Sequence, residues 1–141
     1  MVEAVRFKFL PESLAVDVAE MDAEHEGIFQ MLAHLKNRSL GAVPFTLELA
    51  ESILARLRQH FATEERLARE VDEDFAEHAH KHEFLLRTVS ELLTLTLRGD
   101  GNVFSLLRYI EYWCERHIGE EDRPLAARLK TKALMASSAS L

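Results

Sequence analysis

Apolar residues recur at every third or fourth position over long segments of this chain, with charged and polar residues between them. Such spacing places the apolar side chains along one face of an α-helix. No alternating run rich in β-branched residues indicates a strand. The pattern therefore predicts four helices: from about Ala19 to Arg38, from about Phe45 to Arg69, from just after Asp72–Asp74 to Gly99, and from near Asn102 onward.

Turn and capping residues support these limits. Asp74, with Glu77 three residues later, is suited to begin the third helix as a capping box. Gly99-Asp100-Gly101 is suited to end that helix, because glycine readily adopts the left-handed conformation found after helix ends. Asn102 is then placed to cap the fourth helix.

A fifth, shorter helix is predicted from Pro124 to about Met135, because proline is tolerated in the first turn of a helix. Four long helices joined by short loops pack in alternating directions. With 141 residues, the chain is long enough for one domain with one core. We therefore expect an all-α, up-down-up-down four-helix bundle, with an N-terminal arm (1–18), the bundle itself (19–121), and a C-terminal helix and tail (122–141).

Composition narrows the classes of function. The chain has 24 acidic and 17 basic residues, a net charge of −7, so a nucleic-acid surface is not expected. No run of Lys and Arg indicates anionic lipid, and no stretch approaches the roughly 20 apolar residues that span a bilayer. The N-terminus lacks an apolar secretory core and Cys114 is the single cysteine, so we expect a cytoplasmic location without disulfides.

Ligand-type side chains occur on the apolar faces, where they are unusual. A buried carboxylate such as Glu64 costs several kcal/mol unless it is paired, and a metal ion supplies the missing positive charge. His60 and Glu64 are four residues apart, so they point the same way from one helix, as do His78 and His82. In chain order, the candidates on the four faces are His25, then His60 and Glu64, then His78 and His82, then His117.

Each of these residues also has an ordinary explanation. A lone histidine on an apolar face is more often a hydrogen-bonded core residue than a ligand. Glu64 could pair with Arg58 or Arg66, and histidines 78, 80 and 82 could chelate zinc at the surface if the segment were extended. The coincidence of ligand-type residues on four inward faces favours a shared metal centre instead. His80 and His34 are out of phase with these faces, so we expect both to face solvent.

The end of the fourth helix leaves one choice open. From His117, the residue one turn later is Glu121, whereas Asp122 lies about 140° away on an ideal helix. Periodicity alone therefore favours Glu121. However, Pro124 removes one backbone hydrogen bond and crowds this turn. A widened turn there would bring Asp122 inward, and such bulges recur at functional sites.

Taken together, these motifs resemble the hemerythrin family, specifically the bacterial hemerythrins. The resemblance extends from about Met21 to Asp122, and its four motifs occur in the family's order. They are Met21-Asp22-Ala23-Glu24-His25, followed by Phe29; His60-Phe61-Ala62-Thr63-Glu64-Glu65; His78-x-x-x-His82; and Trp113-x-x-x-His117-Ile118-x-x-x-Asp122.

The resemblance implies a site with two non-haem irons that cycle between Fe²⁺ and Fe³⁺. It implies Asp122, rather than Glu121, as a ligand. By this similarity Glu64 and Asp122 bridge the irons together with an oxo or hydroxo group. The iron held by His25 and His60 keeps one open position, where dioxygen binds. The implied ligands of the other iron are His78, His82 and His117.

The function implied is reversible dioxygen binding for carriage, storage or delivery, without enzymatic turnover and with a redox or oxygen-consuming enzyme as a conceivable partner. Three alternatives stay open. An oxygen or redox sensor usually needs an output domain, and none is seen in these residues. A ferritin-like di-iron oxidase uses more carboxylates. A structural bundle holding zinc or mixed metals is the third, because imidazole suits several metals. An apolar lining would keep oxygen binding reversible, and helical phase suggests Ile28, Leu32, Phe61 and Trp113 for it.

Overall fold

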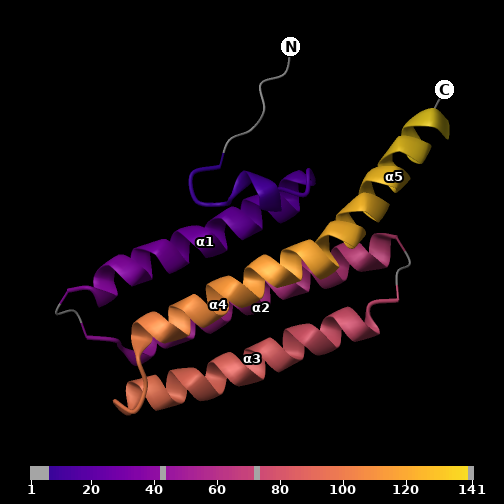
Figure 1. The fold of residues 1–141 in the computed structure, drawn as a ribbon. Coiled ribbons are helices and arrows are strands. Elements are labelled where there is room, and N and C mark those ends of the chain that lie inside the picture. The colour runs from indigo at the N-terminus through magenta and orange to yellow at the C-terminus, as the bar shows by residue number, and fades with distance from the viewer. Residues whose placement is uncertain (1–6, 42–43, 72–73, 140–141) are drawn as a thin grey trace.

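The computed structural model describes residues 7–41, 44–71 and 74–139, and within them the chain is helical, with no strand. Four long helices form the bundle (Figure 1). Helix α1 packs against α2 and α4, and α3 packs against the same two helices, so the four form a closed ring of neighbours. The predicted four-helix bundle is confirmed. Its helices are α1 (Ala19–Ser39), α2 (Leu47–Glu70), α3 (Ala76–Leu97) and α4 (Val103–His117).

The chain does not stop at the end of α4. A five-residue π-helical turn, η2 (Ile118–Asp122), leads directly into α5 (Arg123–Ala139). In Figure 1, α5 extends beyond the bundle from the end of α4. The predicted fifth helix is therefore present, with Pro124 in its first turn, but it is longer than expected and continuous with α4.

The helix limits agree with most of the capping predictions. Asn102 caps α4, because its side-chain oxygen accepts a hydrogen bond from the Ser105 amide at 3.0 Å. Gly99 follows α3 with a φ of +83°, a conformation that a side chain would strain. The prediction for the start of α3 was wrong. Its N-cap is Phe75, without a side-chain capping bond, and Asp74 only accepts from the Ala76 amide at 3.2 Å.

The N-terminal arm is tied to the bundle by carboxylates of α1. Asp22 accepts hydrogen bonds from the amides of Val16 and Asp17, at 2.8 and 3.0 Å. Glu26 does the same for the amides of Phe9 and Leu10. These bonds hold the arm, where it is described, across the first turns of α1. A short 3₁₀ turn, η1 (Glu12–Leu14), lies within this segment.

The core fills the space between the four helices. Its largest fully buried aliphatic side chains come from every long helix, and burying one such side chain contributes about 1.5–3 kcal/mol. The apolar stripes predicted from the sequence therefore face inward. None of the helices in the described part of the chain is both long and apolar enough to cross a membrane. The central core residues include Ile28, Leu32, Ile53, Leu57, Leu85, Leu107 and Ile110.

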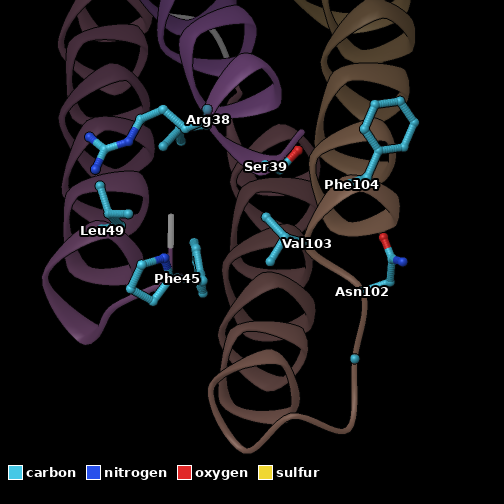
Figure 2. Close-up of a pocket in the computed structure, with 10 residues that line it drawn as sticks. Arg38, Ser39, Phe45, Leu49, Asn102, Val103 and Phe104 are labelled. Carbon is cyan, nitrogen blue, oxygen red and sulfur yellow. The ribbon is translucent and has the colours of Figure 1, made fainter. Parts of the chain in front are cut away.

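The two ends of the bundle differ in chemistry. At one end, where α1 leads toward α2 and α3 toward α4, there is an open hollow of about 280 Å³ (Figure 2). Its wall is mixed in character, with the apolar Phe45, Leu49 and Val103 and the polar Arg38, Ser39 and Asn102. None of the candidate metal ligands lines it. Those side chains gather near the opposite end, close to η2.

Candidate metal centre

All seven candidate side chains come together inside the bundle, near the first half of α1 and the end of α4. They form two overlapping groups, each of which could hold a metal ion. Within a group, the potential ligand atoms lie within 4.8 Å of one another. Both groups contain Glu64 and Asp122. One adds His78, His82 and His117, and the other adds His25 and His60.

The larger group is built from α2, α3, α4 and η2. Nε2 of His117 lies 3.0 Å from Nε2 of His78 and 2.8 Å from Nε2 of His82. Asp122 Oδ1 is 3.1 Å from the Nε2 atoms of both His78 and His117. Glu64 Oε1 is 3.1 Å from Nε2 of His82. Three imidazoles and two carboxylates thus point at one small volume.

The smaller group has two imidazoles. The Nε2 atoms of His25 and His60 are 3.2 Å apart. Asp122 Oδ2 lies 3.0 Å from Nε2 of His25, and Glu64 Oε1 lies 3.3 Å from Nε2 of His60. The two oxygens of Asp122 therefore face different groups, and Glu64 Oε1 contacts a histidine of each. Both carboxylates lie between the groups, as bridging ligands would.

The π-helical turn brings Asp122 into the site. Pro124 has no N–H, so it cannot bond to the Glu120 carbonyl. The backbone N–H of Arg123 bonds to the carbonyl of Ile118, five residues back rather than the usual four. The extra residue in this turn rotates Asp122 inward, where it is 0 % exposed. Glu121 lies at the rim, paired with Lys81, with one oxygen 3.3 Å from Nδ1 of His117. Of the two residues between which the sequence left a choice, the structure therefore places Asp122, and not Glu121, inside the bundle.

The donor atoms have the character and spacing that a metal ion requires. Glu64 and Asp122 are fully buried, and the groups close to their carboxylates are ring nitrogens of the candidate histidines, so their negative charge is costly unless cations balance it. A ring nitrogen binds a metal at about 2.1 Å, so two neighbouring ligands at a right angle are about 3.0 Å apart. The Nε2 separations of 2.8–3.2 Å fit that arrangement.

The electrostatics also indicate a cation site. Burial favours the neutral form of Glu64, but the nearby charge of His60 and hydrogen bonds from His117, His60 and His78 hold its pKa well below the usual range. Burial disfavours charge on His60 as well, yet the Glu64 carboxylate and the hydrogen bond to Glu24 raise its pKa to about 10. The pKa of His117 is raised to about 9 against its burial, by hydrogen bonds to Asp122 and Glu64. Without a metal, protons on His60 and His117 balance the negative charge of the buried carboxylates.

Further contacts orient the ligand rings. Glu24 Oε2 lies 3.0 Å from Nδ1 of His60, and its other oxygen accepts from the Thr63 hydroxyl at 2.6 Å. Such partners of ligand histidines fix the ring orientation and usually affect metal affinity. Neither Glu24 nor Thr63 was predicted to have this role. Both lie within the motifs that carry the resemblance, next to His25 and Glu64.

Aromatic rings pack on three histidines of the larger group. Phe61 stacks on His82, with ring centroids 3.8 Å apart and planes at 8°. Trp113 stacks on His117 at 4.3 Å and 18°, and Phe75 stacks on His78 at 4.3 Å and 26°. These contacts restrict the rotamers of the rings. The contact from Phe75 was not foreseen, because it precedes the helix that carries His78.

The ordinary explanations for these residues do not hold within the described part of the chain. Arg66 pairs with Glu20 and Glu70 rather than with Glu64. His80 is 83 % exposed and points away from the site, and His34 is exposed as well. Histidines 78 and 82 lie on a helix, so the surface chelate of an extended segment does not form.

A small cavity of about 10 Å³ is lined by both histidines of the smaller group and by His117 of the larger one. This is close to the volume needed for one water-sized molecule. Three of the four predicted lining residues, Ile28, Phe61 and Trp113, are present. The prediction that Leu32 lines the cavity was wrong, because its side chain is buried one turn further along α1. Besides candidate ligands, the lining also includes Phe29, Cys114 and Ile118.

The family model described as the hemerythrin HHE cation-binding domain matches residues 16–129. This span covers most of the chain and includes all seven candidate ligands, so the resemblance read from the four motifs is confirmed. A search of curated proteins and a search of solved structures each found no match. The chain belongs to the hemerythrin family and carries that family's cation-binding domain.

Proposed function

We propose that this protein binds dioxygen reversibly at a pair of non-haem irons, as a carrier, store or delivery protein rather than an enzyme. His25, His60, His78, His82, His117, Glu64 and Asp122 would hold the two ions. Five imidazoles and two carboxylates make a donor set poorer in oxygen than the carboxylate-rich sites of ferritin-like proteins. That difference favours binding over oxidation chemistry.

The observation that carries the proposal is the asymmetry of the site. One group offers three histidines and the other two, with both carboxylates shared. The cavity is lined by both histidines of the group with fewer ligands, His25 and His60, and by one of the three histidines of the other group, His117. A metal ion held by His25 and His60 would have a coordination position left for a small molecule, and space beside it. The other group is packed by the rings of Phe61, Trp113 and Phe75.

Two ferrous ions would supply the electrons and the open position that dioxygen requires. The chain's own residues would do the rest. Ile28, Phe29, Phe61 and Ile118 line the cavity with hydrocarbon, which disfavours entry of water and loss of the ligand by proton transfer. Glu24 holds the His60 ring in the orientation that points Nε2 at the site.

Metal analysis combined with visible spectroscopy tests this proposal. The reduced, iron-loaded protein should contain about two irons per chain, one for each ligand group. Its visible absorption should change when air is admitted and return when oxygen is removed under argon. A preparation that holds only zinc would sink the proposal. So would an absorption change that bleaches without return, as expected of an oxidase.

A further inference from the structure

One side chain lies between the cavity and the surface of the bundle. Ten residues line the cavity, and nine of them are at most 6 % exposed. The exception is Trp113 on α4, which is partly exposed. Among the residues that line the cavity, Trp113 is therefore the one that also reaches solvent.

Outside the bundle, Trp113 lines a groove between α3 and α4. The groove consists of two hollows of about 300 and 410 Å³, both open to solvent, and Trp113 and Lys81 line both of them. The first hollow also contains Tyr109 and Tyr112, and the second contains Phe84. The same indole thus borders the cavity inside the bundle and the groove outside it.

His117 also lines both the cavity and the first hollow, but its ring is fixed. It is 4 % exposed, and its Nε2 atom lies 2.8 Å from Nε2 of His82 and 3.1 Å from Oδ1 of Asp122. Trp113 is held by ring contacts: it stacks on His117 at 4.3 Å and meets Phe61 at a steep angle at 5.9 Å. Such contacts are individually weak. Of the two side chains, the indole is therefore the one that can move.

We propose that the groove between α3 and α4 is the entrance to the cavity, and that the Trp113 indole swings outward to admit a ligand of two or three atoms. Where that ligand is dioxygen, the inference rests on the proposed function. Stacked on His117, the indole closes the cavity. The two hollows outside give the ring space to move into.

A side chain that opens an entrance affects rates and not affinity. The ring must move before a ligand enters and again before it leaves. A smaller ring at this position should therefore raise the entry rate and the release rate by the same factor, and leave the dissociation constant unchanged. A residue that only positions His117 would instead alter the dissociation constant or the metal content.

Stopped-flow mixing of azide with the oxidised, iron-loaded protein measures both rates through the visible absorption. Trp113→Phe keeps an aromatic ring on His117 but makes it smaller. We expect both rates to rise together by about two- to tenfold, the factor that corresponds to the contact of one aromatic pair. Unchanged rates, a faster release alone, or an oxidised protein that does not bind azide would each overturn the inference.

Phe29→Leu is the matched control, because it makes an aromatic side chain smaller on the α1 side of the same cavity. Phe29 is 6 % exposed and does not line the groove. We expect this variant to change the azide entry rate less than Trp113→Phe does. If it speeds entry as much, the entrance is not between α3 and α4, and the inference fails.

The motion of the ring can be measured without metal and without a substitution by another amino acid. Trp113 is the only tryptophan in the chain, so labelling with 5-fluorotryptophan gives a single ¹⁹F resonance. In the metal-free protein, relaxation dispersion of this resonance should show exchange between the stacked and the outward position on the microsecond to millisecond timescale. A resonance without such exchange would overturn the inference, whether or not Trp113→Phe folds.

The visible spectrum under dioxygen, recorded with the same preparations, judges the proposed function separately. If Trp113→Phe speeds azide entry and release equally but dioxygen is consumed and not returned, the entrance is established and the oxygen-binding proposal fails. If dioxygen binds reversibly but azide enters and leaves the variant at unchanged rates, only the inference on Trp113 fails.

Discussion

Asp122→Asn should disrupt both metal groups at once, because one carboxylate serves them both. The substitution keeps the shape of the side chain and removes its charge. Asp122 is 0 % exposed and lies 3.0 Å from His25 and 3.1 Å from both His78 and His117. Removing one partner of a buried charge pair typically costs about 3–5 kcal/mol.

For a chain of this length, about 1 kcal/mol shifts the melting temperature by roughly 2–4 °C, so the metal-free variant should melt about 6–20 °C lower. Thermal unfolding of chelator-treated protein, followed by circular dichroism, measures this. Metal analysis after reloading should show loss of iron from both groups. Glu120→Gln is the matched control. Glu120 is exposed and pairs with Arg116, and such exposed pairs contribute about 0–1 kcal/mol. If Asp122→Asn kept the iron to the same extent as Glu120→Gln, the bridging role of Asp122 would be refuted.

Three further results are expected. Glu24→Gln should weaken metal affinity by about 10- to 100-fold in a chelator competition, through the orientation of His60, while Glu20→Gln should not; equal losses would contradict this. The protonated forms of His60 and His117, whose pKa values are raised to about 10 and about 9, stabilise the metal-free protein. This contribution is complete below pH 6.5, and urea unfolding should show its loss as pH rises through 9–10. Loaded protein should lack that alkaline loss. Leu57→Ala should cost about 2–5 kcal/mol of stability in urea, with the iron content unchanged.

Periodicity was enough to predict the bundle, because its apolar stripes face one shared core. The same phase argument correctly separated the inward histidines, such as His60 and His82, from the outward His80. These predictions succeed because an α-helix fixes the direction of each side chain relative to its neighbours. The start of α3 was less predictable, since a carboxylate at Asp74 can satisfy backbone amides without being the cap residue.

The position of Asp122 could not be obtained from ideal helical geometry. It depends on a π-helical turn, which is set by Pro124 and by the packing of the following helix, and neither enters a calculation based on 3.6 residues per turn. The contacts to the ligand rings were hidden for a similar reason. Glu24 meets His60 across two helices, so only the packing of α1 on α2 brings them together.

The lining of the cavity was predicted only in part. Helical phase identified Ile28, Phe61 and Trp113, but it cannot distinguish a residue beside the cavity from one a turn away, such as Leu32. Cys114 was noted in the sequence only as a cysteine without a partner. Its place beside His25 and His60 depends on the distance between α1, α2 and α4, which the sequence pattern does not contain.

The proposed function requires that this chain takes up dioxygen at two bound metal ions and releases it unchanged. An oxygen-electrode titration of the reduced, iron-loaded protein tests it most directly. Because the cavity beside His25 and His60 has room for about one small molecule, we expect uptake of about one dioxygen per chain, with nearly all of it recovered when the solution is equilibrated with argon. Uptake that continues beyond this ratio, or oxygen that is consumed and not returned, would contradict the account.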